Sequence, residues 1–236
     1  MEPLSDLCRR ALAPTAGFRA RAARRPGLGP AVRELLLVRT LPALAALVLG
    51  YGAFAAGYGR ITRMEGPLWD MVREKLPGQV NPADLQAALA GLPELPGWGR
   101  VLPWLALLAP LGVLSVWLHD AVWDHLALWA LRGLGGRRSL RVTLEADAEA
   151  LKVGVLGALA GLLKYLPGAG FVLGILLLPV AVYFWVLRGY ALAAWHGCPV
   201  WKGVLATLLH AAFMGLMVFG TLAMVAVMVM EALRMG

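Results

Sequence analysis

Residues 171–194 read FVLGILLLPVAVYFWVLRGYALAA and contain one charged side chain, Arg188. A helix needs about 20 apolar residues to cross the hydrocarbon core of a bilayer, so this run predicts a transmembrane helix. The sequence as a whole therefore predicts an all-α fold, a polytopic transmembrane helical bundle of about five spans. The other four apolar stretches lie at 35–58, 101–118, 153–166 and 200–230.

The overall composition agrees with a membrane protein. Of the 236 residues, 60% are hydrophobic and 15% are charged, and the mean hydropathy is +0.70. Soluble domains are about half apolar and about a quarter charged, which excludes an ordinary soluble fold as well as collagen-like and disordered classes. Cys8 and Cys198 are too few and too far apart for a zinc knuckle, a redox pair or a disulfide scaffold.

The third stretch, 153–166, is short for a span, and the link that follows it accounts for this. Leu166-Pro167-Gly168-Ala169-Gly170 has the composition of a tight turn, which predicts a helical hairpin with the fourth stretch. Small residues four apart let helix backbones approach closely, within one chain or between copies. The glycines predicted to pack helices in this way are Gly157, Gly161, Gly170 and Gly174.

Basic residues are distributed unevenly around these stretches. They concentrate before the first stretch, between the second and third, and around the turn between the fourth and fifth. Because cytoplasmic loops are enriched in Lys and Arg, the N-terminus is predicted to be cytoplasmic and the C-terminus outside. Some 34 residues precede the first stretch, more than a cleaved leader has, so we expect a retained span in a bacterial cytoplasmic (inner) membrane.

This topology divides the chain into four parts. They are a basic cytoplasmic tail at 1–34, a first span at 35–58, an external loop at 59–100 and a four-span membrane domain at 101–236. Within the loop, Leu68–Leu76 and Asn81–Leu92 show helical spacing of apolar residues, with Asn81 as N-cap and Pro82 as the first helical residue of the second segment. Two short amphipathic helices are therefore expected there.

The tail combines arginines with Leu4, Leu7, Cys8 and Leu12 on one helical face. This pattern is typical of an amphipathic helix that lies on an anionic inner leaflet. A nucleic-acid partner is not expected, because the tail lacks interleaved aromatic residues and any recognition motif. The arginines predicted to face the lipid headgroups are Arg9, Arg10, Arg19, Arg21, Arg24 and Arg25.

The candidate functional residues centre on His119, Asp120, Asp124 and His125. Asp120 and Asp124 are four residues apart and share a helix face, flanked by the two histidines. One interpretation is an interfacial polar turn whose carboxylates pair with nearby bases; the other is a cation or proton site, since intramembrane carboxylates are costly and usually functional. The bases in question are Arg39, Lys152 and Arg188.

If the cluster binds a metal, carboxylate and imidazole ligands together suit hard or borderline ions. The candidate metal ligands are Asp120, Asp124, His119 and His125. A transport pathway through the inner half of the bundle would also include Arg39, Arg188 and His210. A metal-dependent hydrolase is a remote alternative, because the sequence shows no oxyanion partner for these residues.

Two further patterns have competing interpretations. Glu145, Asp147 and Glu149 are expected to pair with bases at 137–141, or to complete a site with Asp120 and Asp124. In the fifth stretch a histidine and several methionines form one helical stripe, which favours packing over a soft-metal path such as one for Cu(I). The bases are Arg137, Arg138 and Arg141, and the stripe is His210, Met214, Met217, Thr221, Met224 and Met228.

Three sequence blocks resemble the Yip-domain family, the Ypt/Rab-interacting membrane proteins, in its bacterial branch. They are His125-Leu126 through Leu134-Gly-Gly-Arg-Arg-Ser139, the turn at 166–170, and Leu187-Arg-Gly-Tyr190 with Trp195-His-Gly197 and Lys202-Gly-Val-Leu205. The resemblance covers about the last 110 residues. It departs from the family at 145–149, where acidic residues replace a neutral run.

The resemblance implies five spans, a cytoplasmic N-terminus and no enzymatic activity. It favours a scaffold that organises membrane or partner proteins through helix packing and oligomerisation, without a cofactor. The alternative is a small channel or transporter for a cation or proton that uses His119, Asp120, Asp124 and His125. The expected partners are an anionic inner leaflet and either further copies of the chain or another membrane protein.

Overall fold

The computed structural model describes residues 4–66, 69–70, 74, 82–166 and 168–235, and the regular structure in these residues is helical. This agrees with the predicted all-α class. The helices are α1 (Leu4–Leu12), α2 (Pro14–Arg24), α3 (Leu28–Thr62), α5 (Pro82–Ala90), α6 (Trp98–Ala130), α7 (Leu140–Val153), α8 (Val155–Gly161), the 3-10 helix η1 (Leu162–Tyr165), α9 (Gly170–Leu176), α10 (Leu178–His196) and α11 (Val200–Met235).

Four helical segments are long and apolar enough to cross a membrane, which makes an integral membrane protein the natural interpretation. They are Leu28–Thr62, Trp98–Ala130, Gly170–His196 and Val200–Met228. The predicted third span, 153–166, corresponds to the shorter apolar segment Val155–Tyr165. The polar helix α7 comes directly before this segment. The segment, which consists of α8 and η1, forms a hairpin with α9.

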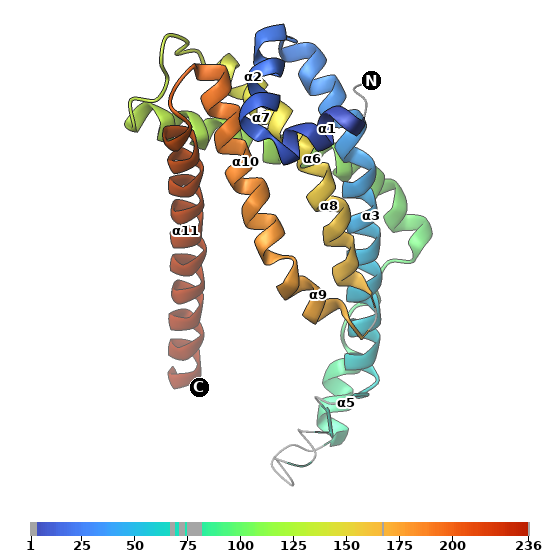
Figure 1. Cartoon of the computed structure of the whole chain (residues 1–236). Coiled ribbons are helices and arrows are strands. Elements are labelled where there is room, and N and C mark those ends of the chain that lie inside the picture. The colour runs from blue at the N-terminus through green and yellow to red at the C-terminus, as the bar shows by residue number, and fades with distance from the viewer. Residues whose placement is uncertain (1–3, 67–68, 71–73, 75–81, 167, 236) are drawn as a thin grey trace.

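The N- and C-termini lie at opposite ends of the molecule (Figure 1). Helices α1, α2 and α7 gather at the N-terminal end, while α3, α10 and α11 extend away from it. Helix α6 runs obliquely across this end, and the far half of α11 stands apart from the other helices. The N-terminal end is therefore where the long helices cross and where their polar residues can meet.

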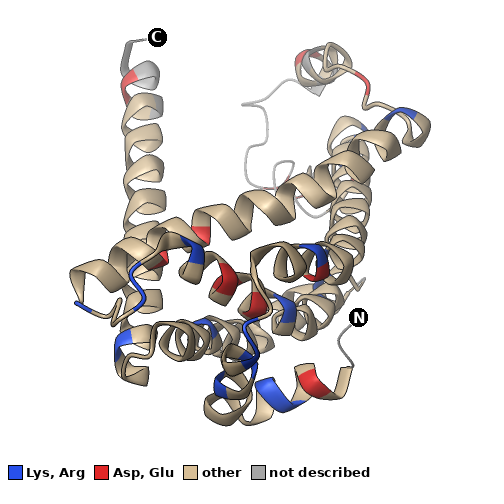
Figure 2. Ribbon diagram, turned by 90° about the horizontal axis from the view of Figure 1, so that it is seen from above, with Lys and Arg blue, Asp and Glu red and all other residues tan. Residues whose placement is uncertain are grey.

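The basic tail folds onto this end instead of lying free, and charged positions gather there (Figure 2). Glu149 of α7 is fully buried and pairs with Arg10 at 2.6 Å, Lys152 at 2.7 Å and Arg21 at 3.1 Å. Glu34 of α3 binds Lys152 at 2.6 Å and Arg21 at 3.0 Å. Four helices, α1, α2, α3 and α7, are thus joined by one charge network.

The prediction that the tail arginines all face lipid headgroups is therefore wrong for Arg10 and Arg21. Arg10 is 2% exposed, and both side chains turn inward because Glu149 would otherwise be a buried, unpaired charge. Leu7 is buried with them, whereas Leu4 and Leu12 remain exposed, so only part of the predicted apolar face packs. Exposed positions remain at Arg9, Arg19, Arg24 and Arg25.

Two glycines permit the close crossing of α10 and α11. A Cβ on Gly189 would lie 2.5 Å from the Val204 Cα, and one on Gly203 would lie 2.1 Å from the Gly189 carbonyl oxygen. Only hydrogen atoms at these positions permit the two backbones to cross so closely. This contact sets the angle at which α11 leaves the bundle.

The four glycines predicted to pack helices divide into two pairs. A Cβ on Gly157 would meet the Phe184 ring at 2.5 Å, and one on Gly170 would meet the Lys164 carbonyl oxygen at 2.0 Å, so both are required by close contacts. Gly161 and Gly174 have open space where a Cβ would be, so the prediction is wrong for them within a single chain. Of the predicted turn, Pro167 lies outside the described residues.

The predicted external loop contains one described helix, α5, which begins at Pro82 as expected. The segment after it is held against α3, where the hydroxyls of Tyr58 and Tyr51 donate to the carbonyls of Pro93 and Pro96. The first predicted amphipathic segment, Leu68–Leu76, lies largely outside the described residues, as does the predicted N-cap Asn81.

Candidate functional site

Four helices bring charged and imidazole side chains together where they cross. Helix α6 supplies Asp120 and Asp124, whose spacing of four places both on the face that meets α10, as predicted. Helix α10 contributes Arg188 and α11 contributes His210. Helix α7 adds Asp147 from outside the long apolar helices, so one of the three acidic residues at 145–149 lies beside Asp120 and Asp124, as the second interpretation expected of all three.

Arg188 is the centre of the cluster. Its Nη1 lies 2.9 Å from Asp120 Oδ2, its Nη2 lies 2.6 Å from Asp124 Oδ2, and its Nε lies 3.7 Å from Asp147 Oδ1. The guanidinium also packs over the Trp185 ring at 5.2 Å. Arg188 is 4% exposed, and Asp124 and Asp147 are fully buried, so these charges interact with little solvent screening.

His210 is fixed by Asp124. Its Nδ1 lies 2.8 Å from Asp124 Oδ1 and 3.4 Å from Arg188 Nη2. Since an ionised carboxylate only accepts, the Nδ1–H of His210 donates to Asp124, the nearer of the two groups, and the lone pair of the ring is then on Nε2. That Nε2 atom is buried and has no hydrogen-bond partner among the described residues.

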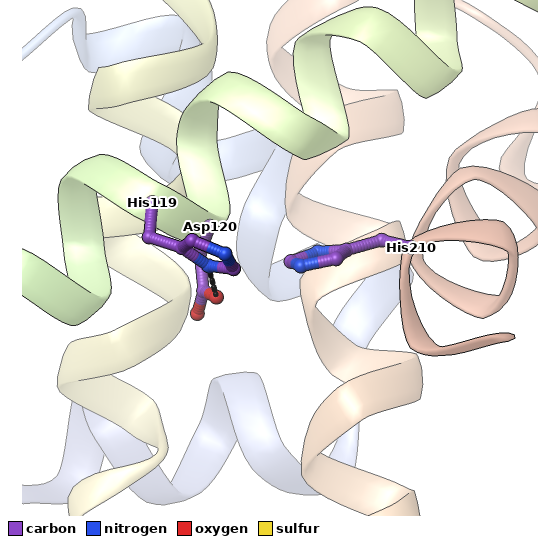
Figure 3. A group of neighbouring side chains, drawn as sticks. All are labelled: His119, Asp120 and His210. Carbon is purple, nitrogen blue, oxygen red and sulfur yellow. Dashed lines mark hydrogen bonds and ion pairs between the residues drawn. The ribbon is translucent and has the colours of Figure 1, made fainter. Parts of the chain in front are cut away.

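His119 lies beside this pair. Its Nδ1 is 3.5 Å from Asp120 Oδ1, and its ring centroid is 5.4 Å from that of His210. In Figure 3 the rings of His119 and His210 extend toward each other from α6 and α11, with the Asp120 carboxylate next to them. One ligand atom from each of these three residues lies within 4.8 Å of the others, so they form a group that could hold a metal ion.

Asp147 is the most strongly perturbed carboxyl group outside the long apolar helices. Burial raises its pKa well above the ordinary value, and the nearby Asp124 charge raises it further, while Arg188 acts in the opposite direction. The single positive charge of Arg188 is thus too small to stabilise negative charges on all three carboxyl groups, and Asp147 favours its protonated form.

The prediction that His125 belongs to this cluster is wrong. Its Nδ1 lies 2.8 Å from Thr143 Oγ1, which lies 2.9 Å from His196 Nε2. His196 Nδ1 lies 2.7 Å from the Arg137 carbonyl oxygen, so it must donate, and its Nε2 accepts from Thr143. Because His125 is one position past Asp124, it points about 100° away, toward α7.

Arg39 also lies outside the ion-pair cluster. Its Nη1 donates to the Gly154 carbonyl at 2.8 Å, which joins α3 to the junction of α7 and α8. Arg39, Asp120 and Arg188 line one cavity of about 420 Å³ between α3, α6, α8, α9 and α10. Lys164 is the fourth charged residue in its lining, and the other lining residues are apolar or glycine.

The remaining charged residues of α7 follow the predictions in part. Glu145 pairs with Arg141 at 3.3 Å as expected, whereas Glu149 joins the tail network. Lys152, a predicted partner of Asp120 and Asp124, instead pairs with Glu149 and Glu34. Of the three predicted bases, Arg188 is therefore the one that pairs with both aspartates.

Most of the methionine stripe of α11 does not pack inside the chain. Met217, Met224 and Met228 are each more than half exposed, so the predicted packing role is wrong for them within a single copy, whereas Met214 is half-buried. His210 lies on the same stripe but near the start of α11, where α6 and α10 cover it.

Sequence reasoning missed two polar residues at this end of the bundle, Thr143 and the role of His196. Their signal was weak, because a threonine in an amphipathic helix and a histidine before a glycine are both common.

Compared with models of known protein families, with curated proteins and with solved structures, the chain matches none.

Proposed function

We propose that this chain is an integral membrane protein that binds a cation at the cluster of His119, Asp120, Asp124, Asp147, Arg188 and His210 and carries it across the bilayer. The observation that supports this most directly is the excess of three buried carboxylates over the one guanidinium that contacts them. Ionisable groups among apolar helices are costly, and they persist mainly where function requires them.

We propose a carrier and not an open channel. Asp120 borders both the imidazole pair and the cavity: its Oδ1 lies 3.5 Å from His119 Nδ1, and the residue lines the cavity. Arg39, Lys164 and Arg188 also line that cavity, and their positive charge repels a free cation. A cation then passes only when the ion pairs at Asp120 and Arg188 rearrange.

The proposed topology has five passes, with the N-terminus cytoplasmic in a bacterial inner membrane. The uneven distribution of arginine supports this orientation. The hairpin of α8, η1 and α9 supports an incomplete third pass, since Val155–Tyr165 is too short to span alone. An odd number of passes also fits termini at opposite ends (Figure 1).

A flux measurement tests the proposal. The purified chain is reconstituted into liposomes that contain ion-sensitive dyes, and gradients of H⁺, Na⁺, K⁺, Mg²⁺, Mn²⁺ and Zn²⁺ are applied in turn. We expect flux of at least one cation, lost in the Asp120→Asn, Asp124→Asn double variant and retained in Glu65→Gln, which alters an exposed carboxylate. Absence of flux for every cation in the wild-type protein would refute the carrier.

A non-enzymatic Yip-like scaffold is the second candidate. Two of the three blocks that carry the resemblance meet at one end of the bundle: His125 and His196 flank Thr143, and Gly189 packs against Gly203. They hold the turns between helices, which supports a common fold more than a common activity. If the chain is a scaffold, it should form oligomers or bind another membrane protein. The Asp120→Asn, Asp124→Asn variant should do so as the wild-type protein does.

A further inference from the structure

The unpartnered nitrogen of His210 is the starting point. His210 is 2% exposed, its Nδ1–H donates to Asp124, and its Nε2 lone pair lies buried without a partner among the described residues. A buried acceptor without a partner is costly, so its presence requires an explanation. A carboxylate behind a histidine is the arrangement that orients metal-binding imidazoles and makes them more basic.

Two further candidate metal ligands, His119 and Asp120, lie beside His210. Arg188 holds Asp120 through Oδ2, which leaves Oδ1 facing His119. The three candidate ligand atoms of His119, Asp120 and His210 lie within 4.8 Å of one another (Figure 3). Zinc ligands lie about 2.0–2.2 Å from the metal, so His119 must move slightly inward, and its side chain is 40% exposed and free to do so.

We propose that His119, Asp120 and His210 bind one divalent first-row transition-metal ion of the zinc class, with Asp124 orienting His210. This rests on the proposed function and names the cation that the site takes. Two imidazoles and one carboxylate favour Zn²⁺-type ions over Mg²⁺ and Ca²⁺, which prefer oxygen ligands, and over Cu(I), which prefers sulfur. Three protein ligands leave a position open for water, as a site that must release its ion requires.

The charge of the surroundings agrees with a bound cation. The carboxylates of Asp120 and Asp124 carry two negative charges, and the Arg188 guanidinium that contacts both carries one positive charge. The remaining negative charge favours a bound cation in a region where unbalanced charge is expensive. Binding of the ion also supplies a partner for the lone pair on His210 Nε2.

Metal binding by the full-length protein tests this inference. The chain is purified in detergent, stripped with a chelator and titrated with Co²⁺, whose visible absorption reports its ligands, and then with Zn²⁺ in competition. We expect one Co²⁺ per chain, displaced by Zn²⁺. His119→Gln and His210→Gln should abolish the spectrum, and Asp124→Asn should weaken binding about 10- to 100-fold, as removal of an orienting carboxylate does.

His125→Gln is the matched control, since His125 is on the same helix but bonds to Thr143, and it should bind Co²⁺ as the wild-type protein does. If the variant of the buried His210 fails to fold, the variant of the more exposed His119, His119→Gln, still tests whether the site binds the metal. The inference is overturned if the wild-type protein binds no stoichiometric Co²⁺, or if His119→Gln binds it unchanged. Flux of another cation without Co²⁺ binding refutes this inference alone, whereas binding without flux refutes the carrier alone.

Discussion

The Arg188 guanidinium donates to Asp124 Oδ2 at 2.6 Å, across the crossing of α10 and α6. The same carboxylate accepts from His210 of α11, so one ion pair fixes three helices. Arg188 and Asp124 are almost completely buried. The attraction between their charges is the main interaction that compensates each side chain for the loss of its hydration. The stability of the bundle and the electrostatics of the candidate site therefore depend on the same contact.

Replacing Arg188 with Met should destabilise the protein severely. Three carboxylates would lose their shared positive partner, and breaking a buried ion pair typically costs about 3–5 kcal/mol. Chemical denaturation in detergent measures the change in unfolding free energy. Arg138→Gln is the control, because Arg138 is exposed, and it should change stability by less than about 0.5 kcal/mol. Equal stability of the two variants would contradict the role of Arg188.

Asp147 should make the protein less stable as pH rises. Unfolded, Asp147 ionises at its ordinary pKa, whereas burial raises the pKa in the folded state, so the folded chain binds more protons between the two values. Its contribution therefore falls by up to about 1.4 kcal/mol per pH unit across that interval. Asp147→Asn, which resembles the protonated form, should flatten the pH profile of unfolding, whereas Asp84→Asn on the exposed face of α5 should not.

Glu149 should hold the tail in place at neutral pH and release it in acid. Burial opposes its ionisation, yet Lys152 and Arg21 outweigh this and hold the pKa of Glu149 below its ordinary value. The stabilisation is present above the ordinary pKa and is lost as pH falls through the lowered one.

Glu149→Gln should accordingly speed amide hydrogen exchange in residues 4–24 at neutral pH. Glu145→Gln is the matched control four residues earlier on α7, since Glu145 pairs with Arg141, whose side chain is 68% exposed. Tail exchange that is equally slow in both variants would show that the charge network does not dock the tail.

Much of the fold could be predicted from local patterns. Apolar runs long enough to span a bilayer identify α3, α6, α10 and α11, because a continuous apolar helix has few other environments. The position of each charged side chain is harder to predict. Asp120 and Asp124 were placed correctly by helical spacing, whereas His125, one residue further, points to a different helix.

The tail shows why the rest could not be predicted. An Arg-rich amphipathic helix has the same pattern whether it lies on lipid or on a protein surface. The choice depends on Glu149, more than a hundred residues later, which needs partners once it is buried. Such long-range pairing of charges leaves no periodic signal in the sequence, and the candidate metal group with His210 is of the same kind.

Thr143 should be essential to the junction between the helices although it touches neither Arg188 nor the candidate metal ligands. Its hydroxyl accepts from His125 and donates to His196, which in turn donates to the Arg137 carbonyl and so holds the turn after α6. Thr143→Val keeps the shape but removes the hydroxyl that bonds to His125 Nδ1 and His196 Nε2, which should cost about 1–3 kcal/mol. Thr221→Val on exposed α11 is the control. Chemical denaturation should show a lower unfolding free energy for Thr143→Val than for Thr221→Val. Amide hydrogen exchange in residues 131–139 should become faster only in Thr143→Val. Unchanged exchange in these residues would mean that other contacts hold the turn.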